Sequence, residues 1–356
     1  FNTVLEYPIM LIAALVALTG GGWAHKQRLW LYVALGALTI AAWAASSAPR
    51  PVMLALLAAP AIALFVMRDK GWSATIAAGC VWGIGAVSNP LSGGHTERSF
   101  FGVLKVVDID GVRIMLHGTT LHGAQDLERP LTALTYYNQA APIGQLFDLK
   151  SDAQRIGVIG LGAGSVACVA DAHQSVVFYE IDPVVVRVAE DPRHFTFLDD
   201  CGDRTEIVLA DGRLGVADAP EGAFDLLIVD AFSSNSVPVH LMTKEAVALY
   251  LSRLSPSGVL AMHVSNRNMA LDTATARIMD SLDAPALVQR YRPGRGEGRR
   301  VFDTQISDVV IAARNEAALS AFVADPRWEP LQSDNGRPWT DDYSNIIGAL
   351  LDDRES

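Results

Sequence analysis

The stretch from residue 155 to residue 164, RIGVIGLGAG, decides the fold of the C-terminal part of this chain. An apolar run of strand length is followed at once by Gly160, Gly162 and Gly164. Glycines at such a point let the backbone approach a ligand and let a helix begin close to the strand. Ser165 stands where the dinucleotide pattern GxGxxG has its third glycine, so a nucleoside without phosphates is favoured over a pyrophosphate.

Strand-like and helical segments alternate after this glycine loop. Helical runs, such as 244–254 and 272–282, lie between several of the strand candidates. Apolar strands with helices between them indicate a buried, mostly parallel sheet in a doubly wound α/β fold, with ligands at the carboxyl ends of the strands. The further strand candidates are 175–182, 205–211, 224–232, 258–266, 286–291 and 307–314.

A smaller β region precedes this fold. Residues 101–118 alternate apolar and polar side chains around Asp110-Gly111, which is a strong hairpin signal. A helix is expected over 134–147. We therefore expect a small β domain with a gate region at 95–150 and the Rossmann-like domain at 151–356.

Three acidic residues end three successive strand candidates. Glu180 follows Gly160 by about 20 residues, where an acid can bind both ribose hydroxyls. Asp211 is placed to accept a hydrogen bond from an adenine amino group, and Asp230 follows the apolar run 226–229. Each acid alone could be a solvated strand end, but three at one sheet edge predict a single adenosine site. Asp182, before Pro183, is expected to cap the next helix.

The first 94 residues differ from the rest in charge. They hold only seven charged side chains, and four uncharged runs are separated by short charged or Pro/Gly turns. A bilayer core of about 30 Å needs about 20 apolar residues as helix, so about four membrane spans are expected here; buried core helices are the alternative. The lipid bilayer would then be a partner. The runs are 7–25, 29–49, 51–67 and 71–94.

Location and chain ends carry further expectations. We expect an integral plasma-membrane protein with its catalytic domain in the cytoplasm, because the expected cofactor is made there. The chain begins at Phe1 and enters an apolar run almost at once, so a processed or truncated N-terminus is expected.

Charge and cysteine usage exclude several classes of partner. The chain has a formal net charge of −11 and no basic stripe, which argues against nucleic acid. The three cysteines lack metal or disulfide spacing, so neither a disulfide framework nor a zinc site is expected, and Cys168 is given a small apolar role on a packed helix. Four histidines also lack ligand spacing and are interpreted as structural or surface residues: His117, His122, His240 and His263.

Together these motifs resemble the spermidine synthase family, specifically its membrane-fused bacterial relatives, over roughly residues 101–345. The resemblance implies a small β domain before a Rossmann-like domain, S-adenosylmethionine or its decarboxylated form as substrate, no metal, and a possible homodimer. It implies that the glycine loop, Glu180 and Asp211 bind the nucleoside and that Asp230 is catalytic. The family's Gln and Tyr ahead of the Rossmann domain look like Gln125, for cofactor binding, and Tyr136, for catalysis. His122 and Tyr137 fall in the family's substrate-gate region.

Two positions depart from the family pattern. Ala163 stands where the family has an aspartate that holds the amine of the aminopropyl group, and Ser233 stands where a second aspartate holds the diamine. The loss of an acid at position 163 would remove its repulsion of the carboxylate of ordinary S-adenosylmethionine. Asp341 and Asp342 are candidates to return acidity to the substrate pocket.

Three hypotheses of function remain open at this point. The first is cleavage of the Cγ–S bond with release of methylthioadenosine, either by aminopropyl-type transfer to an amine oriented by Asp230 or by lyase chemistry on the substrate's own carboxylate. The second is methyl transfer, which would release S-adenosylhomocysteine. The third is a non-catalytic membrane module that binds a nucleoside.

Overall fold

The structure is a computed structural model. It describes residues 94–118, 120–231, 238–266, 269–294, 302–334, 336–346 and 348–349. The chain divides into two compact units, Phe1–Thr96 and Glu97–Ser356. Almost all the described residues belong to the second unit, and the fold below is the fold of that unit.

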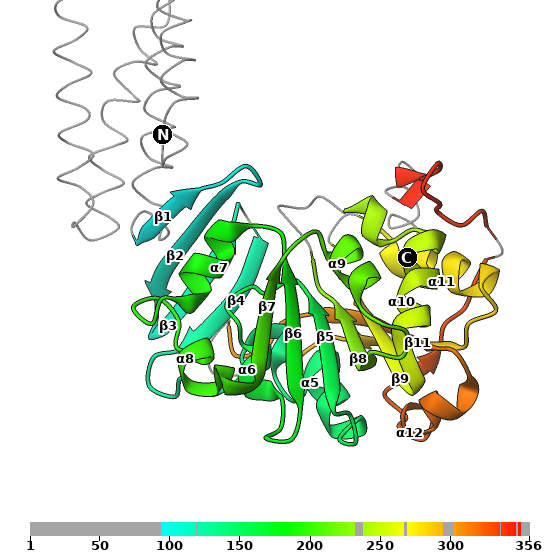
Figure 1. The fold of residues 1–356 in the computed structure, drawn as a ribbon, viewed down its shortest axis with the longest axis horizontal. Helices are drawn as coiled ribbons and strands as arrows, with labels where there is room; N and C mark the ends of the chain where they lie inside the picture. Colours follow the sequence, from blue (N-terminus) through cyan, green and yellow to red (C-terminus); the bar gives the residue numbers. More distant parts are fainter. Residues whose placement is uncertain are drawn as a thin grey trace, which may run out of the picture. The chain divides into compact units, whose positions relative to one another are not determined.

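A large sheet of eight strands forms the centre of this unit (Figure 1). Five neighbouring strands run parallel, and β11 and β10 are added antiparallel at one side. The mostly parallel sheet predicted from the alternating strands and helices is therefore present. In spatial order the strands are β12 (Glu329–Pro330), β10 (Ala286–Tyr291), β11 (Ser307–Ala313), β9 (Leu254–His263), β8 (Phe224–Val229), β5 (Arg155–Ile159), β6 (Ser175–Glu180) and β7 (Thr205–Leu209).

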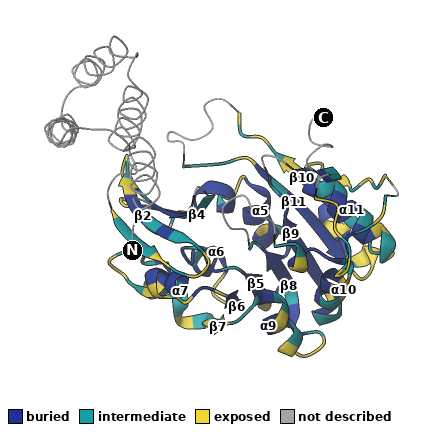
Figure 2. Ribbon diagram, turned by 90° about the horizontal axis from the view of Figure 1, so that it is seen from above, coloured by how far each residue is buried: buried dark blue, intermediate teal, exposed yellow. Residues whose placement is uncertain are grey.

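Alternate residues of the central strands enter two separate hydrophobic clusters. Ile228 and Ala261 belong to one cluster, whereas Leu227 and Leu260 belong to the other. Successive side chains of a strand point to opposite faces of a sheet, so both faces are covered, as a doubly wound fold requires. Figure 2 shows the central strands buried in dark blue.

Helices connect the strands of the large sheet. The α-helices are α5 (Pro142–Leu149), α6 (Val166–Val169), α7 (Pro183–Glu190), α8 (Phe197–Cys201), α9 (Gly212–Asp218), α10 (Lys244–Arg253), α11 (Leu271–Ser281) and α12 (Ser320–Val323). The 3-10 helices are η1 (Thr135–Tyr137), η2 (Gly202–Arg204), η3 (Val239–Leu241) and η4 (Glu316–Leu319).

A separate four-stranded sheet precedes the large one. Its strands are β1 (His95–Arg98), β2 (Val103–Ile109), β3 (Val112–His117) and β4 (Thr120–Asp126), in that spatial order. The predicted hairpin is confirmed: β2 and β3 pair antiparallel, and Asp110 and Gly111 both have positive φ, 50° and 76°. Such φ values at both central residues are typical of a tight two-residue hairpin turn.

The single helix expected over 134–147 is divided in two. Residues 135–137 form η1, and α5 begins at Pro142. A proline disfavours helical backbone in the residue before it but suits the first position of a helix. Ala141 is accordingly extended, with ψ of 156°, and the helix starts anew after it.

The expectation of membrane helices ahead of the α/β fold is corrected by the structure. No helix within the described ranges is long and apolar enough to cross a membrane. What those ranges contain is a Rossmann-like α/β fold with a small antiparallel sheet. The four uncharged runs fall on residues 1–94, which lie, apart from Gly94, outside the described residues. The expected plasma-membrane location depended on those runs and is withdrawn with them.

Candidate active site

A cavity of about 190 Å³ lies at the carboxyl ends of the parallel strands. Glu180 ends β6, Asp211 follows β7 and Asp230 follows β8, and all three line this cavity. The three predicted strand-end acids thus line one cavity, and adenosine as its ligand stays a prediction. Asp182 also lines the cavity, which brings the number of carboxylates around it to four.

The glycine loop lets two backbone segments come close to the floor of the cavity. Gly160 has φ of +103°, and a Cβ there would lie 2.3 Å from the carbonyl oxygen of Asp230. Gly162 has φ of +54°, and its Cβ would lie 2.3 Å from the carbonyl oxygen of His122. Side chains are excluded at both positions by conformation and by space. Gly164, with φ of +84°, instead packs beside Leu198 of α8.

Glu180 is held in place by two backbone N–H groups. Its Oε2 accepts a hydrogen bond from Leu161 N at 3.0 Å, and its Oε1 accepts one from Asp182 N at 2.8 Å. Burial raises the pKa of Glu180, and these N–H groups oppose that rise. Asp182 caps α7 by accepting from Val184 N at 2.9 Å, as predicted, with Pro183 at the first helical position.

Asp211 also has a structural role in the lining of the cavity. It is the N-cap of α9, where its Oδ1 accepts from Arg213 N at 3.0 Å and Leu214 N at 3.1 Å. Its Oδ2 lies 2.9 Å from Nε2 of His240, a cavity-lining residue whose side chain is 53% exposed. Asp211 therefore presents one oxygen toward an open part of the cavity, shared with an imidazole.

Asp230 is buried and receives hydrogen bonds on both oxygens. The Tyr137 hydroxyl donates to Oδ2, and Nδ1 of His263 lies 2.7 Å from Oδ1. Burial raises the pKa of Asp230, but its contacts with His263 and Tyr137 outweigh burial and lower the pKa overall. Asp230 is thus kept ionised in a place where an unsupported carboxylate would take up a proton.

Two tyrosines from η1 lie beside Asp230 in the lining of the cavity. The ring centroids of Tyr136 and Tyr137 lie 4.6 Å apart, and Tyr136 lies 4.6 Å from the ring of His263. Burial and the neighbouring Asp230 charge raise the pKa of both tyrosines well above the usual value. Both hydroxyls therefore remain protonated and serve as hydrogen-bond donors.

His122 of β4 lies on the wall of the cavity with its ring 5.6 Å from that of His117. Burial lowers the pKa of His122 to about 4, with a smaller contribution from His117. Its Nε2 is buried and has no hydrogen-bond partner among the described residues. His122 is therefore a neutral imidazole with an unused nitrogen beside Asp230.

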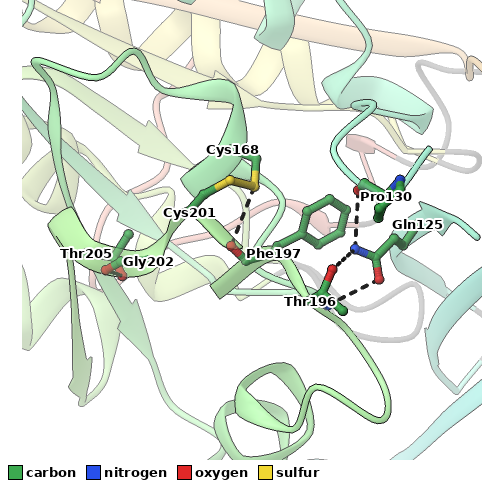
Figure 3. The surroundings of a disulfide bond; sticks show 8 residues. All are labelled: Gln125, Pro130, Cys168, Thr196, Phe197, Cys201, Gly202 and Thr205. Atoms are coloured by element: carbon green, nitrogen blue, oxygen red, sulfur yellow. Dashed lines mark hydrogen bonds between the residues drawn. A yellow bond between two sulfur atoms is a disulfide. The ribbon is translucent and has the colours of Figure 1, made fainter. Parts of the chain in front are cut away.

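Gln125 does not line the cavity, although the resemblance gives it a nucleoside-binding role. Its Nε2 donates to Thr196 Oγ1 at 2.9 Å and to Pro130 O at 3.2 Å, and its Oε1 accepts from Thr196 N at 3.2 Å (Figure 3). The side chain joins β4 to the segment before α8. A role of Gln125 in binding stays a prediction.

A disulfide lies beside these contacts and corrects the expectation of unpaired cysteines. Cys168 in α6 is bonded to Cys201 in α8, 33 residues further along the chain (Figure 3). No short cysteine motif announces such a pair, because two helices from different connections bring the residues together. Cys168 is therefore a cross-link and not a free, small apolar residue.

The remaining candidates lie elsewhere. Asp341 pairs with Arg213 at 2.7 Å and accepts from Thr243 Oγ1 at 2.8 Å, away from the cavity lining. Asp342 is exposed, and Ser233 lies outside the described residues. Ala163 is buried: a Cβ on Gly123 of β4 would lie 2.5 Å from the Cβ of Ala163. The side chain at position 163 thus faces the small sheet.

Sequence reasoning missed the part played by His263 and His240. Both were interpreted as structural or surface residues because they lack metal-ligand spacing. The usable signal for His263 is its place at the end of the strand next to β8, with the same strand parity as Asp230. For His240 the sequence offers no comparable signal, since it lies in the connection between β8 and α10 and not at a strand end.

Comparisons with known proteins agree with the resemblance to aminopropyltransferases. No family model matches the sequence. The polyamine aminopropyltransferase of Vibrio vulnificus (strain CMCP6) is 34% identical over 140 residues, 37% of this chain and 44% of that protein. The polyamine aminopropyltransferase of Chromobacterium violaceum is 27% identical over 223 residues, 61% of this chain and 76% of that protein. This chain thus spans less than half of the first relative.

A solved structure shows the same fold. A probable spermidine synthase from Corynebacterium glutamicum ATCC 13032 matches with a TM-score of 0.52 and 14% identity, over 71% of this chain and 98% of that one. At this identity the likeness concerns the fold alone. The two sequence relatives bear the name of a transferase, so the expected similarity to an enzyme family is confirmed, whereas none of these comparisons supports a membrane-fused relationship.

Proposed function

We propose that this chain transfers an aminopropyl group from decarboxylated S-adenosylmethionine to an amine of the polyamine class. One observation carries the proposal: four carboxylates line the cavity, and its lining includes no lysine or arginine from the described part of the chain. Both proposed substrates are cations, a sulfonium and an ammonium. Opposite charges attract more strongly in a partly desolvated cavity than in water.

The nucleoside half of the donor would lie along the glycine loop. Glu180 would accept hydrogen bonds from the ribose hydroxyls, because a carboxylate oxygen that already accepts one N–H bond has a further lone pair. Asp211 would accept from the adenine amino group, either beside His240 or in its place. Gly160 and Gly162 leave the backbone bare where the donor would lie.

Asp230 would serve the transfer step. The bound ammonium first gives one proton to Asp230, which the surrounding donors keep ionised beforehand. The freed amine nitrogen attacks the aminopropyl carbon bonded to the sulfonium, the new N–C bond forms, and the C–S electron pair leaves with methylthioadenosine. The positive charge passes from sulfur to the product nitrogen. Tyr136 and Tyr137 restrict this end of the cavity and orient the acceptor.

One departure from the family pattern, at Ala163, also bears on the substrates. Ala163 faces Gly123 and supplies no charge, so Asp182, Glu180 and Asp230 would provide the acidity around the propylamine group. The sequence relatives support aminopropyl transfer and give no support to lyase chemistry, methyl transfer or a non-catalytic module.

A product assay tests the proposal. The full chain is incubated with decarboxylated S-adenosylmethionine and a short diamine, and the products are identified by mass spectrometry. Equal amounts of methylthioadenosine and aminopropylated diamine are expected, with Asp230→Asn as the control that abolishes both. A parallel reaction with ordinary S-adenosylmethionine should give no S-adenosylhomocysteine. Absence of the aminopropylated product would reject the proposal.

A further inference from the structure

We propose that His263 is a positioning residue for the transfer step, which holds and orients Asp230 through its Nδ1–H group. This inference rests on the proposed function, since it assigns a task to a residue behind the group that would take the amine proton. His263 does not belong to the cavity lining, so it acts through Asp230 and does not touch the substrate.

Strand register places the two residues side by side. β8 and β9 are parallel, and Val229 pairs with Met262. The residues that follow, Asp230 and His263, therefore occupy neighbouring rows at the same edge of the sheet. Val229 and Met262 belong to one hydrophobic cluster, so Asp230 and His263 point to the opposite face, where Tyr136 and Tyr137 lie.

The imidazole is fixed on more than one side. Its Nδ1 lies 2.7 Å from Asp230 Oδ1, its ring packs at 4.6 Å against Tyr136, and its side chain is only 8% exposed. Its backbone lies within β9, where His263 pairs with Val309 of β11. An ionised carboxylate only accepts hydrogen bonds, so this contact requires a proton on Nδ1.

Each oxygen of the Asp230 carboxylate has one hydrogen-bond partner in the protein. His263 Nδ1 holds Oδ1 and the Tyr137 hydroxyl holds Oδ2, and together they restrain rotation of the carboxylate. Each oxygen keeps a lone pair for the substrate amine. The bound ammonium gives up a proton before its nitrogen forms the N–C bond. That proton goes to one of these lone pairs, and His263 keeps its Nδ1 proton throughout.

The titratable groups that face Asp230 come from three elements packed against it. They are His263 from β9, His122 from β4, and Tyr136 and Tyr137 from η1. His263 is the largest of the influences that lower the pKa of Asp230 against its burial. Removal of His263 should therefore raise that pKa and move the acid limb of the rate profile to higher pH.

Two variants separate positioning from a general structural role. His263→Leu removes the donor, and His263→Asn keeps an N–H donor on a short planar side chain. We expect His263→Leu to lower kcat about tenfold to a hundredfold with KM changed by less than about threefold, and to move the acid limb upward. His263→Asn should regain about tenfold of the lost kcat. Equal losses in both variants with an unmoved acid limb would overturn the inference.

A measurement without substrate keeps the inference independent of the reaction. In the full chain labelled with ¹⁵N-histidine, the His263 resonances should show a proton on Nδ1, and Asp230→Asn should shift the Nδ1 signal. A wild-type chain in which Nδ1 of His263 carries no proton would overturn the inference. If no methylthioadenosine is released in the product assay, the proposed function fails, while this measurement still decides the role of His263.

Discussion

Two aspartates in the lining of the cavity are each paired with a histidine, yet one pair is buried and the other is exposed. Asp230 and His263 are 2.7 Å apart and 6% and 8% exposed, whereas Asp211 and His240 are 2.9 Å apart and 21% and 53% exposed. The Asp230–His263 contact is therefore desolvated, whereas the similar Asp211–His240 contact is solvated. Electrostatic interactions are much stronger in the desolvated place.

The difference also extends to what holds each aspartate. Asp230 receives side-chain donors from two separate elements, η1 and β9, whereas one Asp211 oxygen is used by the first turn of its own helix. Asp230 is thus held by tertiary contacts, whereas Asp211 is held by the first turn of its own helix in addition to His240. We expect the buried pair to determine the rate of the reaction and the exposed pair to affect binding only.

The largest effect is expected from Asp230→Asn. The substitution removes the proton acceptor, and its amide group cannot accept both donors that hold the carboxylate. We expect kcat to fall by about 10²- to 10⁴-fold with little change in the affinity for the nucleoside. Steady-state kinetics and calorimetry with methylthioadenosine measure the two quantities. A loss of affinity that equals the loss of rate would contradict the assignment of rate to the buried pair and of binding to the exposed pair.

The disulfide joins α6 and α8, two helices that contribute no residue to the lining of the cavity. Cross-linking residues 33 positions apart limits the unfolded chain, so reduction of Cys168–Cys201 should lower the free energy of unfolding by about 3 kcal/mol. Denaturant unfolding of the oxidised and reduced full chain measures this, with Cys168→Ser as a matched control that should not respond to reductant. Reduction without any loss of stability would show that the disulfide does not contribute to the free energy of unfolding.

Burial of His122 makes the stability of the folded chain depend on pH. Its pKa is 6.5 when unperturbed and about 4 in the folded protein, so between these values the unfolded chain alone takes up the proton. Stability should therefore fall as the pH drops from 6.5 toward 4, by about 3 kcal/mol from this residue.

Unfolding measured at several pH values in the wild type and in His122→Gln isolates that contribution. The variant should lose less stability on acidification than the wild type by about that amount. Parallel curves for wild type and His122→Gln would mean that His122 is not held neutral by burial.

The accuracy of the sequence predictions follows the same division between local and tertiary structure. The positions of Glu180, Asp211 and Asp230 were predictable, because an acid directly after an apolar strand emerges at a known edge of the sheet. The cap formed by Asp182 before Pro183 was predictable for a similar local reason. These signals lie within a few residues of one another.

Features that depend on register between distant segments were not predictable. His122 and Gln125 lie on the same strand three residues apart, and only the structure shows that His122 faces the cavity and Gln125 does not. The register of β3 and β4 shifts between Met115 and Leu116, which one sequence does not reveal. His263 and the Cys168–Cys201 bond likewise depend on pairings between separate elements.

The smallest effect is expected at the exposed pair. A solvated pair of this kind contributes at most about 0–1 kcal/mol even when both partners are charged, and Asp211 keeps its two backbone donors when the imidazole is removed. His240→Ala should therefore change the free energy of unfolding by less than about 1 kcal/mol and leave kcat nearly unchanged. The affinity for methylthioadenosine should rise slightly, because Oδ2 of Asp211 is then open to the adenine amino group. Calorimetry against the wild type measures this, and a large loss of kcat in His240→Ala would mean that the two Asp–His pairs are not divided between binding and chemistry.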